Sequence, residues 1–208
     1  MAEKSLTRKV IEAHLTEGQW GNEEIALKVD QCLLQDATGT QACQQLEELV
    51  QKIGRKLKPR ADTSLQDGIL PLLYFERFGL DKVAVPLAIQ YVDHNIKQID
   101  ERNADDHAFL LSFCQRYGIW YSPLGNGICH QVHLERFAVP GSVIIGADSH
   151  TTTAGAMGTL ALGVGGLDVA AVLAGHPFRL RTPKVVQVWL EGKLPPWVSA
   201  TDIILEIL

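Results

Sequence analysis

A short apolar run that ends in three polar residues is the feature that most constrains how this chain can fold. Residues 143–145 read as a buried strand, and Asp148, Ser149 and His150 follow it almost at once. A turn with a helix cap needs only one such residue, so three in succession, followed by three threonines, favour a functional site. Open α/β sheets place their ligands beyond the carboxyl ends of their strands, and the pattern predicts such an end here.

Apolar runs of strand length alternate with helical stripes along the sequence. Strands are expected at residues 25–34, 82–89, 119–122, 142–145 and 184–190. Helices are expected at residues 6–15, 42–53, 105–117 and 167–174, with a last one capped by Ser199 or Thr201. Gly54 and Gly118 stand where helices end, and a turn-rich stretch covers residues 59–68. This alternation predicts an α/β fold with a mostly parallel sheet.

Charge and hydropathy argue against several classes of protein. The formal net charge of -5 gives no electrostatic reason to expect a nucleic acid or an anionic membrane as partner. The one basic run, residues 52–60, is expected to be a solvated linker. No apolar run approaches the length of a membrane span. The N-terminus lacks the apolar core of a secretory signal, which predicts a cytoplasmic protein.

The four cysteines do not form a recognisable metal-binding pattern. Cys32, Cys43, Cys114 and Cys129 are widely spaced and include no C-x-x-C. This spacing argues against a zinc ribbon and against an iron–sulfur site contained within these residues. Buried free thiols in a reducing compartment are the expected state.

Three polar clusters follow predicted strands. They are Gln35-Asp36, Asp93-His94-Asn95 and Asp148-Ser149-His150, and a fourth polar residue, His130, lies in a glycine-flanked turn at residues 125–131. The carboxyl ends of parallel strands meet at one edge of the sheet, so these clusters are expected to share a cleft. Histidines paired with carboxylates suit general acid–base chemistry near neutral pH.

Two other kinds of site fit parts of this pattern. A Ser-His-Asp hydrolase is disfavoured because residues adjacent in sequence do not normally form a relay and no G-x-S-x-G surrounds Ser149. A mononuclear metallohydrolase that uses His94, His130, His133 and Asp148 remains possible. The glycines at 155, 158, 163, 165 and 166 lack the order of a dinucleotide fingerprint. They are expected to allow close helix packing and backbone approach to the site.

The chain resembles the aconitase family over nearly its whole length. The resemblance rests on residues 125–131, 140–141, 145–151 and 163–168, with support from 34–38, 82–86, 93–94 and 183–186. It implies a layered α/β/α N-terminal domain with a mostly parallel sheet. It also implies a hydro-lyase of the tricarboxylic acid cycle that interconverts citrate and isocitrate through cis-aconitate, with a [4Fe–4S] cluster as Lewis acid.

The same resemblance assigns roles to the polar clusters. It implies catalytic roles for Asp93, His94, His130, Asp148 and His150. It implies substrate binding by Gln35, Ser149, Asp148 and His150. Asp93 and His94 would handle the hydroxyl proton, whereas Gln35 and Ser149 would hold substrate carboxylates. The expected small-molecule partner is therefore a tricarboxylate.

The cluster cysteines of the family are expected beyond Leu208, so no metal ligand is expected within residues 1–208. Residues 1–183 are then expected to form the first α/β domain, and residues 184–208 the truncated start of a second. The remaining domains of the same enzyme are expected partners, and this portion alone is expected to be inactive. The alternatives are a 3-isopropylmalate or homoaconitate dehydratase large subunit, an RNA-binding relative and an inert fragment.

Overall fold

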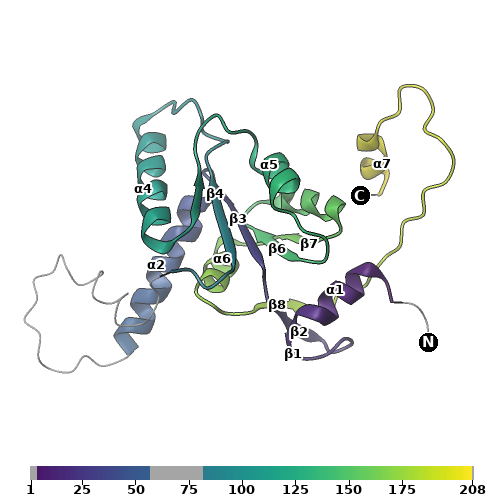
Figure 1. The fold of residues 1–208 in the computed structure, drawn as a ribbon, viewed down its shortest axis with the longest axis horizontal. Coiled ribbons are helices and arrows are strands. Elements are labelled where there is room, and N and C mark those ends of the chain that lie inside the picture. The colour runs from purple at the N-terminus through teal and green to yellow at the C-terminus, as the bar shows by residue number, and fades with distance from the viewer. Residues whose placement is uncertain (1–3, 57–81, 208) are drawn as a thin grey trace, which may run out of the picture.

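Two sheets organise the residues that the computed structural model describes, 4–56 and 82–207 (Figure 1). The strands are β1 (Leu15–Glu17), β2 (Glu24–Leu27), β3 (Gln31–Gln35), β4 (Leu87–Tyr91), β5 (Trp120–Ser122), β6 (Val143–Gly146), β7 (Leu160–Gly163) and β8 (Phe178–Arg181). The α-helices are α1 (Leu6–His14), α2 (Gly39–Lys56), α4 (Glu101–Tyr117), α5 (Cys129–Arg136), α6 (Gly166–Leu173) and α7 (Ala200–Ile207). One 3-10 helix, η1, spans Ser149–Met157.

The larger sheet is parallel throughout and has the strand order β5-β4-β3-β6-β7. The chain runs from β3 outward through β4 to β5, and then crosses back to place β6 on the other side of β3. This reversal makes the boundary between β3 and β6 a topological switch point. Ligands bind at such points, beyond the carboxyl ends of the strands.

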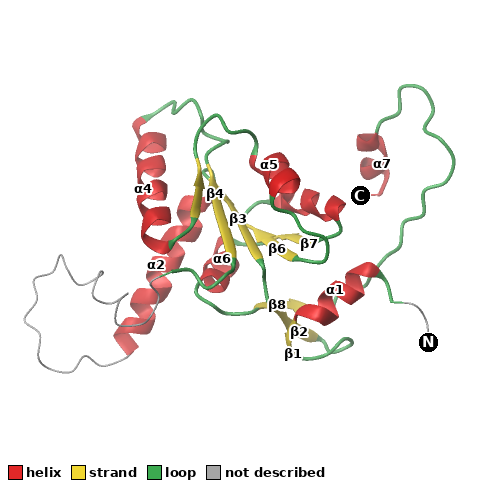
Figure 2. Cartoon of the chain, viewed as in Figure 1, coloured by secondary structure: helices red, strands yellow, loops and turns green. Residues whose placement is uncertain are grey.

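Helices cover both faces of this sheet, which confirms the predicted layered α/β/α arrangement (Figure 2). Cys32 and Leu34 of β3 pack with α2, α4 and α6 in the larger apolar core. Leu33, between them in sequence, points to the other face and packs with Cys129 and Val132 of α5. The alternation of side chains along a strand explains how one short strand serves two cores.

A smaller antiparallel sheet, β1-β2-β8, lies beside the first. Helix α1 packs on it through Ile11, which joins Ile25 and Leu27 of β2 in a separate apolar cluster. Ser5 caps α1 by accepting a hydrogen bond from the backbone N–H of Arg8. Among the described ranges, none of the helices combines the length and apolar character that a membrane crossing requires.

Two predicted strands have different limits in the structure. The run 25–34 forms two strands, β2 and β3, because the chain leaves the small sheet at residues 28–30 and enters the large one. Asp30 fixes this transition, since its carboxylate accepts a hydrogen bond from the Val143 backbone N–H at 2.9 Å. The expected strand 82–89 is β4, which begins only at Leu87, directly after Pro86. Proline cannot donate to a sheet ladder.

The prediction of a strand at residues 184–190 is wrong. Residues 182–191 have no regular secondary structure, and the long loop between β8 and α7 carries them away from both sheets (Figure 2). Many of their apolar side chains are exposed to solvent among the described residues, as Val186 and Trp189 show with exposures of 80% and 73%. Strands β7 and β8 were not expected, because each is only four residues long and lies in a glycine-rich or charged context.

The predicted helices are largely confirmed. Gly118 ends α4 in the left-handed conformation, as expected, but α2 continues through Gly54 to Lys56. Ser199 directly precedes α7, at the position predicted for a cap, but its hydroxyl and backbone N–H both donate to the Asp202 carboxylate in the first turn. The turn-rich stretch 59–68 and the last part of the basic run 52–60 lie outside the described residues.

Candidate active site

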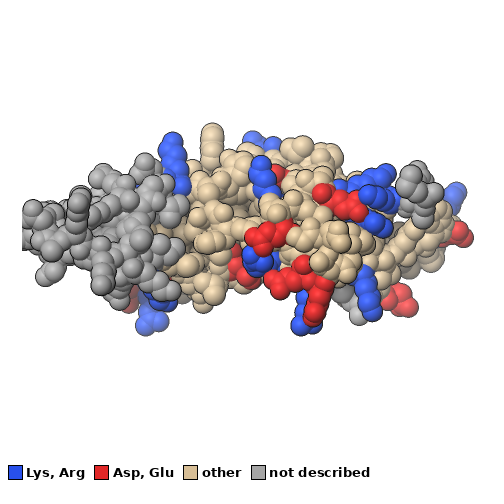
Figure 3. Space-filling model, turned by 90° about the horizontal axis from the view of Figure 1, so that it is seen from below, with Lys and Arg blue, Asp and Glu red and all other residues tan. Residues whose placement is uncertain are grey.

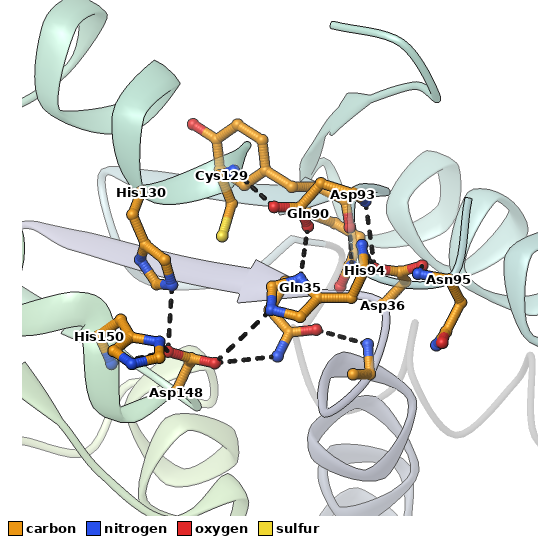
Figure 4. A network of polar contacts seen from close by, with 12 residues as sticks. Gln35, Asp36, Gln90, Asp93, His94, Asn95, Cys129, His130, Asp148 and His150 are labelled. Atoms are coloured by element: carbon orange, nitrogen blue, oxygen red, sulfur yellow. Dashed lines mark hydrogen bonds and ion pairs between the residues drawn. The ribbon is translucent and has the colours of Figure 1, made fainter. Parts of the chain in front are cut away.

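The polar clusters predicted to share a cleft do lie together at the carboxyl edge of the parallel sheet (Figure 4). Gln35 ends β3, His94 follows β4 and Asp148 follows β6. Helix α5 adds His130 from above this edge. The group therefore occupies the switch point between β3 and β6, where the fold alone would place a ligand.

Asp148 is the centre of this group. Its Oδ2 accepts a hydrogen bond from the Gln35 amide at 3.2 Å, and its Oδ1 accepts one from the His150 backbone N–H at 2.7 Å. Three imidazoles surround the same carboxylate, with the nearest nitrogen of His130 at 3.0 Å, of His150 at 3.6 Å and of His94 at 4.0 Å. Burial raises the pKa of Asp148, but the His150 N–H, His130 and Gln35 together bring it below its ordinary value. The carboxylate is therefore ionised at neutral pH.

His130 lies in the first turn of α5 rather than in the predicted glycine turn. Its ring is largely buried, and within the described residues neither ring nitrogen makes a hydrogen bond of good geometry, although Nε2 is 3.0 Å from Asp148 Oδ1. Burial lowers the pKa of His130, and the opposing attraction of Asp148 does not restore it. A neutral, buried and unsatisfied imidazole is costly in a static core, and such a group indicates a ligand-binding position.

Asp93 has two tasks at once. Its Oδ1 accepts a hydrogen bond from His94 Nδ1 at 2.9 Å, and its Oδ2 accepts one from the Cys129 backbone N–H at 2.6 Å. Ile128 at the N-cap position of α5 makes no side-chain cap, so Asp93 supplies the missing acceptor from another loop. This pairing orients the His94 ring and leaves its Nε2 facing Asp148 (Figure 4).

Ser149 and the glycine-rich segment are placed as the sequence suggested. Ser149 is exposed at the first position of η1, and Asp148 caps that helix. A Cβ at Gly163, at the end of β7, would lie 2.6 Å from the Asp148 carbonyl oxygen. Only glycine therefore allows the backbone of Asp148 to lie this close to β7. A Cβ at Gly166 would lie at an ordinary 3.6 Å from the Ala42 backbone of α2, and its one short contact, 2.9 Å, would be with the amide end of the flexible Gln45 side chain. Gly163 is therefore the position that supports the predicted backbone approach to the site.

His133 does not join His130, although the two are three residues apart on α5. It is fully buried, its Nε2 donates to Gln31 Oε1 at 2.9 Å, and the Tyr91 hydroxyl lies 3.1 Å from its Nδ1. His133 is therefore not available as a metal ligand beside His130, and the four-residue set of the metallohydrolase alternative does not form. Among the described residues, two other sets have ligand atoms within 4.8 Å of one another. One is Asp93, His94 and Cys129, and the other is His130, Asp148 and His150.

His107 is a polar residue of this region that the sequence analysis missed. It lies on α4, buried, with Nε2 2.9 Å from the Asp36 carboxylate that supports the His94 loop. The signal was present, because the buried positions of α4 (107, 110, 113, 114 and 117) follow one helical stripe that a histidine begins. A polar residue on an apolar stripe requires a buried partner.

All four cysteines are buried and free. Burial raises the pKa of each thiol, to about 12 for Cys114. Three of them, Cys32, Cys43 and Cys114, pack in the larger apolar core, and Cys129 lies on the other face of the sheet. Thiolates are the ligands of iron–sulfur clusters, so the cysteines of this chain do not fit as a ligand set.

Comparison with known proteins gives a consistent result. A family model described as the aconitase family (aconitate hydratase) matches residues 8–208. The mitochondrial aconitate hydratase of Saccharomyces cerevisiae is 40% identical over 164 residues, which is 73% of this chain and 21% of that protein. A putative mitochondrial aconitate hydratase of Aspergillus fumigatus is 41% identical over 170 residues, covering 75% and 21%.

A third relative, the mitochondrial aconitate hydratase of Arthroderma benhamiae, is 32% identical over 216 residues, covering 99% of this chain and 24% of that protein. The chain thus spans about a fifth to a quarter of the length of these curated relatives. All three relatives are named as mitochondrial enzymes, which does not fit the cytoplasmic location predicted from the sequence.

Proposed function

The chain belongs to the aconitase family, and from this premise we propose that it is the N-terminal portion of a hydro-lyase that interconverts citrate and isocitrate through cis-aconitate. The observation that carries the proposal is the position of Asp148 between three imidazoles, with His130 at 3.0 Å. Dehydration of a hydroxy acid requires a proton donor at the leaving hydroxyl and a base for the reverse step. Groups with both capacities line this cleft.

His94 is the residue we assign to the substrate hydroxyl. Its Nδ1 is bound by Asp93 at 2.9 Å, which fixes the ring and the tautomer, and its Nε2 faces the cleft. A carboxylate that holds one nitrogen of a histidine stabilises the imidazolium that forms when the other nitrogen takes up a proton. His94 can therefore donate a proton to the departing hydroxyl, which leaves as water, and take a proton from water during hydration.

His130 and His150 complete the acid–base group around Asp148. We assign His130 a neutral state at neutral pH, since its pKa is lowered by burial, and its unpartnered nitrogens can then bind a polar group of the substrate. His150 is exposed at the rim, with its backbone N–H bound to Asp148. Asp148, anionic and nearly enclosed, would keep these imidazoles oriented toward the same point.

Gln35 and Ser149 are the groups we assign to substrate carboxylates. The Gln35 Oε1 accepts a hydrogen bond from the Ala37 backbone N–H just before α2, which fixes the orientation of the amide. The Gln35 Nε2 donates to Asp148 and points toward the cleft (Figure 4). The N-terminal end of α2 adds a favourable field for an anion, and Ser149 offers an exposed hydroxyl.

In this proposal a [4Fe–4S] cluster, when bound, would supply Lewis-acid chemistry at the substrate hydroxyl and carboxylate. The buried thiols of this chain do not suit it, so its cysteine ligands would come from outside residues 1–208. The part of the enzyme formed here would supply the proton-handling and carboxylate-binding groups, and would be inactive alone. We also propose that residues 1–183 form the first α/β domain and that residues 184–208 begin a second, which would cover the exposed Trp189 and Val186.

The charge pattern on one face of the molecule (Figure 3) favours a small-molecule partner over a nucleic acid. On the face shown in Figure 3, the basic and acidic side chains of the described residues are interspersed. Nucleic-acid binding relies on a continuous basic surface. We therefore propose a tricarboxylate as the substrate and the other domains of the same enzyme as the protein partners.

The test compares substrates with the complete enzyme, meaning the full polypeptide that carries this chain. After cluster reconstitution, citrate, isocitrate and 3-isopropylmalate are assayed side by side at equal iron content. We expect kcat/KM for citrate and isocitrate to exceed that for 3-isopropylmalate by at least about 100-fold, which corresponds to roughly 2.7 kcal/mol. A preference for 3-isopropylmalate would move the protein to the dehydratase alternative.

A further inference from the structure

A buried carboxylate lies directly beneath the loop that carries His94. The Asp36 side chain is fully buried, and its Oδ1 accepts hydrogen bonds from the backbone N–H groups of Asp93 at 3.2 Å and of His94 at 2.9 Å. Its Oδ2 accepts a third from the Asn95 backbone N–H at 2.8 Å. Three successive amides of one loop thus depend on a single side chain at the end of β3.

The fourth donor to this carboxylate is His107. Its Nε2 lies 2.9 Å from Asp36 Oδ2, and its Nδ1 lies 2.7 Å from Gln98 Nε2. An ionised carboxylate can only accept, so His107 Nε2 carries a proton and donates. The Gln98 amide then donates to Nδ1, and a single neutral tautomer satisfies every group.

This arrangement holds the His94 loop at both ends. Gln98 has a left-handed backbone conformation, with φ at 45°, and its N–H donates to the Asn95 carbonyl at 3.0 Å. Residues 93–95 bind Asp36 directly, and Gln98 binds it through His107. Burial raises the pKa of Asp36, but the three backbone donors and His107 outweigh this effect and bring the pKa below its ordinary value. The carboxylate therefore stays ionised and can accept all four bonds.

We propose that Asp36 and His107 are positioning residues, which fix His94 so that its Nε2 faces Asp148 across the cleft. The inference rests on the proposed function, because it concerns the residue assigned to the substrate hydroxyl. Neither side chain is in a position to touch substrate, since both are buried behind the loop. Their effect must therefore pass through the backbone of residues 93–95.

Substitutions at this network have distinct expected effects. In His107→Leu, the loop keeps its three bonds to Asp36 but loses the link through Gln98. In Asp36→Asn, the new NH2 group faces at least one backbone N–H in either orientation of the amide, and two donors cannot pair. His107→Gln retains an N–H donor and should restore the link in part. Because a misplacement of about 1 Å can cost about 100-fold in rate, we expect kcat losses of roughly ten- to 100-fold for the first two variants.

Asp100→Asn is the matched control. Asp100 lies in the same connection and caps α4 by accepting a bond from the Asn103 N–H at 3.1 Å, and asparagine is an equally good cap. The experiment measures kcat and KM per bound iron in the complete enzyme, together with hydrogen–deuterium exchange of the amides in residues 93–98. The exchange reports the bonds to Asp36 and does not depend on activity.

Support for the proposal is a lower kcat with KM within about threefold, faster exchange confined to residues 93–98, and recovery in His107→Gln. Asp100→Asn should match the unmodified enzyme in all three respects. Unchanged exchange in Asp36→Asn, or a kcat of His107→Leu within twofold of the unmodified enzyme, would overturn it. If the unmodified enzyme does not turn over citrate, the proposed function fails, whereas the exchange still decides whether Asp36 and His107 hold the loop.

Discussion

His130 and Asp148 approach the cleft from α5 and from the end of β6, and place Nε2 and Oδ1 3.0 Å apart. Helix α5 lies in the connection from β5 to β6, which crosses back over the sheet and creates the switch point. One residue is neutral because it is buried, and the other is ionised because it accepts well-placed hydrogen bonds. The pair therefore combines a proton acceptor with a fixed negative charge.

The charge of Asp148 should be measurable at His130. Burial lowers the pKa of His130 and Asp148 partly opposes this effect, so Asp148→Asn should lower that pKa further. The pH dependence of exchange at the imidazole C2 hydrogen, followed by mass spectrometry in the complete enzyme, reports the pKa without an activity assay. An unchanged or higher His130 pKa in the variant would show that Asp148 does not act on this ring.

The end of β7 offers a test of backbone approach. Gly163→Ala would place a Cβ 2.6 Å from the Asp148 carbonyl oxygen, whereas a Cβ at Gly155 meets nothing within 4 Å. We expect Gly163→Ala to lower kcat by at least about tenfold through displacement of Asp148 and Ser149. Gly155→Ala should leave kcat within about twofold. Equal effects of the two substitutions would mean that the turn tolerates displacement.

His94 and Ser149 should affect different kinetic constants. Ser149→Ala should remove a hydrogen bond to a charged substrate group, worth roughly 1.5–3 kcal/mol, and raise KM. His94→Ala should lower kcat by about 10²–10⁴, since it removes proton handling at the hydroxyl. Iron content should stay the same in both. Loss of iron in proportion to activity in His94→Ala would refute the acid–base role.

The buried His133 should make stability depend on pH. Its pKa is lowered by burial to about 4 from 6.5, so the unfolded chain takes up a proton below pH 6.5 that the folded chain takes up only near pH 4. The free energy of unfolding should therefore decrease by up to about 3 kcal/mol as the pH falls from 6.5 to 4. Denaturant unfolding of His133→Gln should show a shallower dependence. The same pH dependence of the unfolding free energy in the variant and the unmodified protein would contradict a lowered His133 pKa. Above pH 7, where His133 is neutral in both states, the difference in unfolding free energy between the two proteins reports only the loss of its hydrogen bonds and packing.

The sequence predicted which polar residues lie together better than it predicted some strands. Gln35, His94 and Asp148 could be grouped because each follows a strand, and parallel strands bring their carboxyl ends to one edge. The register of these strands did not need to be known for that inference. Helix α4 was also predictable, since its apolar stripe ends at Gly118, which adopts the left-handed conformation.

The errors have a common physical origin in tertiary context. The break between β2 and β3 depends on Asp30 binding the backbone of Val143, more than 100 residues away. Strand β8 forms because Arg179 and Leu180 pair with β2, although its own sequence is weakly apolar. Conversely, residues 184–190 have the pattern of a strand but no neighbouring strand in the described part of the chain. A local sequence pattern cannot indicate partners that lie far away along the chain.

The most direct test of the acid–base centre is the hydration of cis-aconitate by Asp148→Asn in the complete enzyme. Asp168→Asn, an exposed carboxylate in the first turn of α6, is the control. Equal iron content in both variants and a loss of hydration rate of about 10²–10⁴ in Asp148→Asn alone are the predicted result. A near-normal rate in Asp148→Asn, with its iron retained, would contradict the account.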